Sequence, residues 1–227
     1  MIMLSRSINN IKKCKVKDRC FILANGPSLN NHDLSLLANE DVISINASPL
    51  ALTAYKIESK FYCVSDPRFL LDEKKREIFL TQLNSANTNI LVRDTVKAYL
   101  KNELKITKNL DKVFAIPSLG RDGFSKNLLR GFFFGCSTTH LALQLAYFLN
   151  YSKVYLLGLD LNYGFDDYRR FYTEQVVQEY DLLVSVQLSN YQLANNIFYS
   201  ENKELYICNK KSWAAPYIPY AEYINLF

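Results

Sequence analysis

Short runs of apolar residues recur along the chain, and polar stretches with helical character separate most of them. The runs lack the alternation of apolar and polar positions that a half-exposed strand shows, so they predict strands buried on both faces. Strands that alternate with helices favour a mainly parallel sheet with helices on both faces. The predicted strands are 20–24, 42–46, 60–65, 89–92, 113–116, 153–157 and 205–208.

Capping residues and charge predict the helices between these strands. A helix should begin near Asp33, the charged stretch 72–82 should form a second, and 141–149 should form an apolar third. Residues 171–197 look largely helical. The segment 117–135 holds four of the seven glycines and predicts a long loop, which in a compact domain is often functional.

The fold class expected from this order is α/β, a Rossmann-like single domain with a helical lid region. A chain of 227 residues, 49% of them hydrophobic, can bury the core that such a domain needs. The expected organisation is a basic N-terminal extension over 1–17, a nucleotide-binding domain over 18–168, and a lid, last strand and aromatic tail over 169–227. Ligands bind beyond the carboxyl ends of parallel strands, so four loops should meet at one crevice. These loops are 25–28, 46–49, 65–68 and 158–168.

Composition narrows the classes of function. The net charge of +5 favours anionic ligands or an anionic membrane surface and does not imply nucleic acid. The five cysteines are far apart without a C-x-x-C pair, so we expect a reducing compartment and no zinc site. No stretch approaches the roughly 18 apolar residues of a membrane span, and the start lacks the features of a signal peptide, so a cytoplasmic location is predicted. The aromatic C-terminal tail is a candidate for docking on a membrane or a partner.

The first predicted strand is followed by Asn25-Gly26-Pro27-Ser28. Gly26 suits a close approach of backbone to a ligand, Pro27 constrains the turn, and Ser28 can cap a following helix or bind an anion. An ordinary strand-to-helix turn is the alternative. The segment matches neither G-x-G-x-x-G nor the P-loop, so neither of those modes of nucleotide binding is predicted.

Polar residues also follow other predicted strands. Asn46 and Asp66 come directly after buried strands, where an amide or carboxylate can bond a ribose, base or sugar. Gly158 and Asp160 end a later strand, and the carboxylate could hold a ribose diol or stabilise its own loop. Taken singly, such residues are common turn formers.

Hydroxyl and basic groups add candidates for binding an anion. Ser137 and Thr138 combine hydroxyls with the amides of a helix start, which suits a phosphate or carboxylate, although a plain helix cap explains them too. Tyr168, with Arg169 and Arg170 beside it, could donate to a phosphate. Those three residues are also typical of a solvated helix face.

The two histidines differ in setting. His32 lies a few residues after the 25–28 turn and could face the crevice, whereas His140 lies in an apolar helix and is expected to be a packed residue. No triad of nucleophile, base and acid is visible.

Together, the sequence NGPSL at 25–29, the strand ending in Asn46, and the pattern Y-x-x-V-Y-L-x-G-x-D at 151–160 resemble the bacterial sialyltransferases of glycosyltransferase family 42. A looser resemblance is to bacterial proteins that share the Asn-Gly-Pro-Ser turn and late Gly-x-Asp strand, including nonulosonate transferases and pterin pyrophosphokinase-like proteins. The resemblance covers about residues 18–168. It implies a CMP-activated acidic sugar as donor, a Rossmann-like nucleotide domain, and neither a metal nor a separate cofactor.

The resemblance also implies roles for single residues. Asn25 would lie against the donor phosphate and ribose, and Asn46 against the donor. Asp66 stands where the family has another donor-binding Asn. Ser137 and Thr138 match a Thr-Ser pair that contacts the CMP moiety.

Later positions match less closely. Asp160 matches an acid of the nucleotide site, and Tyr168 falls where the family has the second of two phosphate-binding tyrosines. The first of these is Asn162 here, with Tyr163 adjacent. The family uses a late His as general base, and this chain has no His after His140.

The general base is therefore open. Inverting transfer needs a group of suitable pKa beside the acceptor hydroxyl, and a retaining mechanism could instead use Asp66 as nucleophile. The missing His is also compatible with a different ulosonic acid, such as Kdo or a legionaminic-type sugar. The candidate bases are Asp66, His32, Asp166, Asp167 and Glu174.

The predicted function is metal-independent transfer of a nonulosonic acid from its CMP form to a bacterial surface glycan such as lipopolysaccharide or capsule. The expected partners are the CMP-sugar and a glycan or glycolipid acceptor, with peripheral contact at the inner membrane face and an oligomer left open. A pterin pyrophosphokinase-like enzyme using ATP and magnesium is one alternative. A non-catalytic nucleotide-binding module is another.

Overall fold

The computed structural model describes residue 8 and residues 11–162, 170–172 and 182–227. Seven strands form one sheet in the order β5-β4-β3-β2-β1-β8-β9, and every neighbouring pair is parallel. The predicted mainly parallel α/β sheet is confirmed. The strands are β1 (Arg19–Leu23), β2 (Asp41–Ile45), β3 (Phe61–Val64), β4 (Asn89–Arg93), β5 (Val113–Ile116), β8 (Lys153–Leu157) and β9 (Glu204–Ile207).

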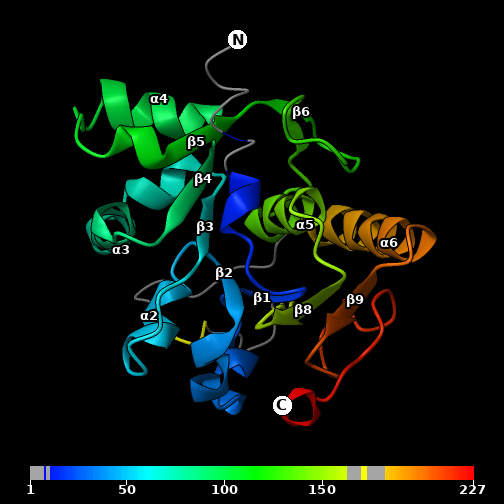
Figure 1. Ribbon diagram of the computed structural model, residues 1–227. Helices are drawn as coiled ribbons and strands as arrows, with labels where there is room; N and C mark the ends of the chain where they lie inside the picture. Colours follow the sequence, from blue (N-terminus) through cyan, green and yellow to red (C-terminus); the bar gives the residue numbers. More distant parts are fainter. Residues whose placement is uncertain (1–7, 9–10, 163–169, 173–181) are drawn as a thin grey trace.

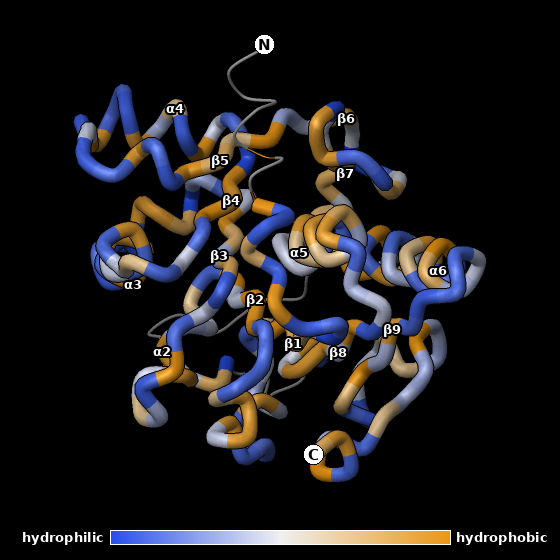
Figure 2. Tube along the Cα trace, in the orientation of Figure 1, coloured by the Kyte–Doolittle hydropathy of each residue, from blue (hydrophilic) through white to orange (hydrophobic). Residues whose placement is uncertain are grey.

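Helices cover both faces of this sheet (Figure 1). The strand residues are apolar on both sides because successive side chains point to opposite faces, and the apolar colour of Figure 2 concentrates along the strands and the inner sides of the helices. Cys20 and Ile22 pack toward α5 and α6, whereas Phe21 and Leu23 pack into the core of the other face. Helices α5 (Thr138–Phe148) and α6 (Val184–Ser200) cover the first face, and α2 (Pro49–Thr53), α3 (Glu73–Asn84) and α4 (Asp94–Asn102) lie on the second.

The connection from β1 to β2 differs from the predicted α-helix. It consists of two 3-10 helices, Pro27–Asn31 and Leu34–Asn39. The Asp33 carboxylate accepts hydrogen bonds from the amide and hydroxyl of Ser35. These bonds cap the second 3-10 helix, which begins where the helix near Asp33 was predicted.

Other segments refine the predicted boundaries. Helix α4 was not predicted, although its buried Val96 and Leu100 have the i, i+4 spacing of an amphipathic helix. The glycine-rich loop contains a small parallel pair, β6 (Ser118–Gly120) and β7 (Phe132–Phe133). Helix α6 begins inside the region predicted as helical, 171–197, and ends three residues beyond it, while residues 173–181 of that region lie outside the described residues.

The aromatic tail packs on its own domain. Tyr206 stacks on Tyr155 with ring centroids 5.5 Å apart, and Phe227 stacks on Phe21 at 5.7 Å. Tyr206 and Phe227 therefore cover the sheet face at β8 and β1. Docking of this tail on a membrane stays a prediction. None of the helices in the described ranges is long and apolar enough to cross a bilayer.

His140 is fully buried in α5, as expected for a packed residue. Its Nε2 lies 2.7 Å from the Gly123 carbonyl, which makes Nε2 the protonated nitrogen, and Nδ1 has no partner among the described residues. Burial lowers the pKa of His140 to about 4, against smaller opposing contributions from the Gly123 carbonyl and the charge of Asp122.

We predict that this histidine makes the fold acid-sensitive. The unfolded chain protonates His140 below about pH 6.5 and the folded chain only near pH 4, so stability present above pH 6.5 is lost as the pH falls. Between pH 7 and 5 the loss should be about 2 kcal/mol. His140→Gln, whose amide can donate to the Gly123 carbonyl, should show a correspondingly weaker decline in the free energy of unfolding, measured by urea titration. Equal declines in the two proteins would contradict the assignment.

Candidate functional site

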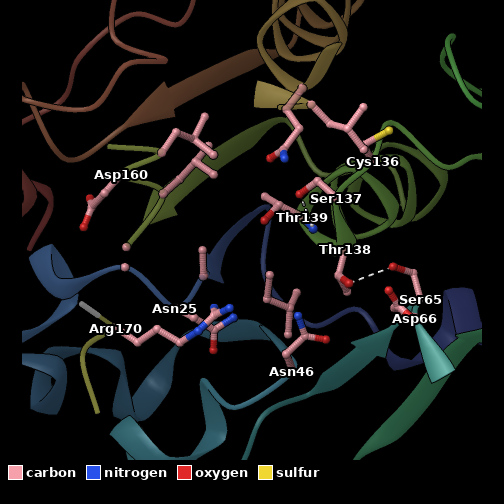
Figure 3. Close-up of a pocket in the computed structure, with 18 of the residues that line it drawn as sticks. Asn25, Asn46, Ser65, Asp66, Cys136, Ser137, Thr138, Thr139, Asp160 and Arg170 are labelled. Atoms are coloured by element: carbon pink, nitrogen blue, oxygen red, sulfur yellow. Dashed lines mark hydrogen bonds between the residues drawn. The ribbon is translucent and has the colours of Figure 1, made fainter. Parts of the chain in front are cut away.

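A polar pocket of about 430 Å³ opens where the strand order reverses, between β1 and β8. In open parallel sheets this reversal leaves a crevice at the carboxyl ends of the strands, and the volume is in the range of small-ligand sites. Three of the four loops expected to converge meet here, together with residues 158–161 of the fourth, whose residues 163–168 lie outside the described ranges (Figure 3). The pocket is lined by Ala24, Asn25, Gly26, Ile45, Asn46, Ser65, Asp66, Arg68, Phe134, Cys136, Ser137, Thr138, Thr139, Gly158, Leu159, Asp160, Leu161, Arg170, Leu183 and Gln187.

Asp160 holds the floor of the pocket together. Its carboxylate accepts from the Ser28 amide at 2.8 Å, from the Ser28 hydroxyl, and from Nδ2 of Asn209 at 2.6 Å. Its carbonyl accepts from the amide of Trp213 at 3.1 Å. Asp160 is 4% exposed, so these bonds compensate for the loss of water around the carboxylate. Both Asp160 and Ser28 therefore act first as a link between loops.

Gly26 is explained by the same link. A Cβ at Gly26 would lie 2.4 Å from Asp160 Oδ2 and 2.6 Å from the Gly158 carbonyl oxygen. The Gly26 amide already donates to that carbonyl at 2.7 Å. The predicted close approach is present, but the partner it requires is the 158–160 loop of this chain.

Two asparagines present unsatisfied amide oxygens in the pocket. Oδ1 of Asn25 and Oδ1 of Asn46 are buried without a hydrogen-bond partner among the described residues. Asn25 is 6% exposed, and Asn46 has a left-handed backbone with φ of 48°, directly after β2. Unpaired buried acceptors are costly, and strained backbone concentrates at functional sites, so both side chains are suited to donor groups of a ligand.

The amino terminus of α5 forms another wall. Ser137 caps this helix by accepting from the Thr139 amide at 3.2 Å, and its hydroxyl lies 2.7 Å from that of Tyr191. The Thr138 hydroxyl is 2.7 Å from that of Ser65 at the end of β3. An eleven-residue helix directs its positive end into the pocket, which suits an anion.

Asp66 lies at the rim beyond β3, paired with Arg68. The Arg68 Nε donates to Asp66 Oδ2 at 2.8 Å, and the Arg68 amide donates to Oδ1 at 2.9 Å. Partial burial opposes ionisation, but the hydrogen bonds and charge of Arg68, with a smaller contribution from Arg93, lower the pKa of Asp66 below its ordinary value. Asp66 is therefore a carboxylate at neutral pH.

Arg170 brings a second positive group to the pocket, as its place beside Tyr168 suggested. The chain at this point is held to the first turn, because the Phe171 amide donates to the Asn25 carbonyl at 3.1 Å. In Figure 3 the Arg170 guanidinium reaches toward Asn25.

Several predicted residues lie elsewhere. His32 packs against Tyr223 with ring centroids 4.8 Å apart, is absent from the pocket lining, and has its pKa lowered chiefly by burial. Asn162 donates to the Lys211 carbonyl at 3.3 Å, outside the pocket lining. The remaining candidates lie outside the described residues: Tyr163, Asp166, Asp167, Tyr168, Arg169 and Glu174.

Some lining residues were not predicted. Gln187 and Leu183 come from the start of α6, far along the chain from the motifs. Gln187 is 3% exposed. Its place one helical turn before the buried Tyr191 is the only feature of the sequence that indicates a buried polar side chain here. Phe134 and Cys136, in the stretch before α5, gave no sequence signal of their own.

Two carboxylates of the pocket, the natural candidates for metal ligands, are both engaged within the protein. Asp66 is paired with Arg68, and Asp160 is bonded to Ser28 and Asn209. Within the described ranges no group of three or more His, Cys, Asp or Glu side chains is placed to hold a metal ion. Metal independence stays a prediction.

The chain is similar to known proteins in sequence and in fold. The model of the family described as 6-hydroxymethylpterin diphosphokinase MptE-like matches residues 2–166. A relative from Escherichia coli named probable 3-deoxy-manno-octulosonic acid transferase is 26% identical over 200 residues, covering 74% of this chain and 69% of the relative.

Solved structures share the fold. The sialyltransferase CstII from Campylobacter jejuni, in complex with the substrate analogue CMP-3FNeuAc, has a TM-score of 0.51 at 17% identity, covering 92% of this chain and 88% of that one. The sialyltransferase CST-II with a trisaccharide acceptor and CMP has a TM-score of 0.52 at 18% identity, with coverage of 91% and 87%.

We predict that Gly26→Ala weakens the fold at the pocket floor. The added methyl group would overlap Asp160 and must displace the 158–160 loop, at a cost of about 1–3 kcal/mol in the free energy of unfolding. Gly120→Ala is the matched control, because its Cβ would meet nothing closer than 3.7 Å. Chemical denaturation measures both. A Gly26→Ala protein as stable as the control would show that the two loops are not held in this contact.

Proposed function

The chain belongs to the 6-hydroxymethylpterin diphosphokinase MptE-like family, and we propose that it is a glycosyltransferase whose donor is a nonulosonic acid activated as its CMP derivative. The name of its Escherichia coli relative, a 3-deoxy-manno-octulosonic acid transferase, supports the reaction class. The sialyltransferases that share its fold were solved with CMP or a CMP-sugar analogue, which supports the donor. The observation that carries the proposal is a pocket at the reversal of strand order whose walls combine unsatisfied amides with a positive helix end.

The chemistry of the walls fits a nucleoside monophosphate joined to an acidic sugar. Oδ1 of Asn25 and Oδ1 of Asn46 need donors, which a ribose hydroxyl or a cytosine amino group supplies. The phosphate would lie at the amino terminus of α5, within reach of Arg170 and the Thr138 hydroxyl. These positive and hydroxyl groups offset the charge that develops on the departing phosphate.

The transfer breaks the bond between the anomeric carbon and the phosphate oxygen and forms one to the acceptor hydroxyl oxygen. CMP leaves with the bonding electron pair, and the acceptor proton passes to a base. Asp66 is the base we propose, because it is ionised, lies at the pocket rim and is held by Arg68. His32 is outside the pocket and is not proposed further. The acceptor would be a bacterial surface glycan or glycolipid.

A pterin pyrophosphokinase-like activity is the second candidate, and the name of the family favours it. That reaction passes a diphosphate group from ATP and usually relies on magnesium to offset phosphate charge. Binding of ATP that depends on magnesium would identify it.

We predict that CMP stabilises the protein against heat and that CDP, UDP and ATP do so less. At 100 times the dissociation constant, the stabilisation is about 2.7 kcal/mol, or a rise in Tm of roughly 5–10 °C for a chain of this size. Asn25→Asp places a negative charge beside the Arg170 guanidinium (Figure 3), which would then pair with the new carboxylate instead of the phosphate, and the dissociation constant for CMP should rise about 10- to 100-fold.

Asn31→Asp, on an exposed residue of the same turn, is the matched control and should bind CMP normally. Thermal shift and calorimetry provide the readouts, with and without magnesium. No shift with millimolar CMP, or a larger shift with magnesium and ATP, would overturn the CMP-sugar proposal.

We predict that Asp66→Asn separates catalysis from donor binding. An amide cannot accept the acceptor proton, so turnover should fall at least about 100-fold, the usual contribution of a general base. CMP affinity should change less than threefold. Asp111→Asn is the control. It removes the same charge from an exposed residue just before the amino end of β5, whereas the pocket lies at the carboxyl ends of the strands. Retained turnover in Asp66→Asn, measured by release of CMP from a CMP-sugar, would assign the base to another group.

A further inference from the structure

Arg93 lies at the carboxyl end of β4, next to the pocket rim. Its guanidinium carbon is 5.2 Å from the centroid of the Phe134 ring, and Phe134 lines the pocket. The side chain is half-buried, and its charge is felt by Asp66. Stacking on an aromatic ring restricts the guanidinium while leaving its edge available for hydrogen bonds.

Among the described residues, this guanidinium has no anionic partner. Nε of Arg93 is buried without a hydrogen-bond partner, and none of the carboxylates in the described ranges lies within ion-pair distance of Arg93. The carboxylate that senses its charge, Asp66, is already engaged by Arg68. Its neighbour Asp94 accepts from the amide of Thr95.

Two other arginines, Arg68 of the pocket lining and Arg121 after β6, behave differently. Arg68 is paired with Asp66, and Arg121 with Asp122 at 2.8 Å. Both of those side chains are mostly exposed, whereas Arg93 is the more enclosed. A buried Nε without a partner is costly, and an anionic ligand that accepts from it would remove that cost.

The position of Arg93 along the sheet indicates which part of a substrate it would meet. Neighbouring strands lie about 4.8 Å apart, so the end of β4 is roughly 14 Å from the end of β1. A nucleotide at the β1 and β8 end, with its sugar extending past β2, would bring the reacting carbon near β3. Arg93 then lies on the far side of Asp66 from the nucleotide.

We propose that Arg93, supported by Phe134, binds an anionic group of the acceptor, either a sugar carboxylate or a phosphate monoester. This inference rests on the proposed transferase function, in which Asp66 marks the transfer point. A planar guanidinium can bind either anion through two hydrogen bonds and would turn the acceptor hydroxyl toward Asp66. The acceptor is thus an acidic or phosphorylated sugar.

The test uses three methyl glycosides that differ only at C6: a glucoside, the matching glucuronide, and the glucoside 6-phosphate. Binding is measured by calorimetry and saturation-transfer NMR, without donor and with saturating CMP. The wild-type protein should bind at least one charged glycoside 10-fold or more tightly than the glucoside. The arms separate a carboxylate ligand from a phosphate.

Variants assign the preference to Arg93. Arg93→Met should remove the preference for the charged glycoside and leave CMP affinity unchanged. Arg130→Met deletes the same charge from an exposed loop residue and should retain the preference. Arg93→Lys keeps the charge without the planar fork, so an intermediate loss of about 3- to 10-fold is expected, and it replaces Arg93→Met if that variant does not fold.

Equal or undetectable binding of all three glycosides by the wild-type protein would overturn the proposal. Loss of neutral and charged binding alike in Arg93→Met, with CMP affinity intact, would assign Arg93 a structural role and also overturn it. Because binding of the glycosides is also measured without donor, the test of the anion site does not depend on the proposed CMP-sugar donor. A protein that ignores CMP but prefers charged glycosides through Arg93 would refute the donor and retain the anion site.

Discussion

The buried carboxylate of Asp160 is the interaction on which the pocket depends. It joins the turn after β1, the loop after β8 and the loop after β9 through bonds to Ser28 and Asn209. A buried carboxylate needs hydrogen-bond partners, so these bonds hold the three loops in one arrangement. Gly26 follows from this constraint, because a side chain there would displace the carboxylate.

The link leaves other polar groups available. Asp160 and Ser28 satisfy one another, whereas the amide oxygens of Asn25 and Asn46 remain without partners among the described residues. In the turn after β1, Ser28 thus holds the loops together, while Asn25, three residues earlier, presents an unsatisfied oxygen to the pocket. A rigid floor of this kind reduces the entropy lost when a ligand is bound.

The sheet and the convergence of the loops could be predicted from the sequence, because the strands of a buried parallel sheet are continuous apolar runs and their carboxyl ends share one edge. The sequence was insufficient where a residue's partner is distant in the chain. The NGPS turn indicates a close approach, but only the fold identifies Asp160 as the group approached. The sequence pattern also did not distinguish the 3-10 helices after β1 from an α-helix, and Gln187 reaches the pocket through the packing of α6. Arg93 gave no signal, since a basic residue ending a strand is common.

The charge of the side chains along the crevice changes from β8 to β4. Asp160 at the β8 end has its hydrogen-bonding capacity taken up within the protein, while the positive groups of Arg170 and the α5 terminus also line the pocket. Asp66 follows at β3 as a carboxylate with a lowered pKa, and Arg93 lies beyond it at β4. Because Arg68 is paired with Asp66, the end of β3 offers a phosphate no uncompensated positive charge, and an anion is favoured on either side of it. Two anionic substrates could therefore bind with their charges apart and their neutral reacting atoms together at Asp66.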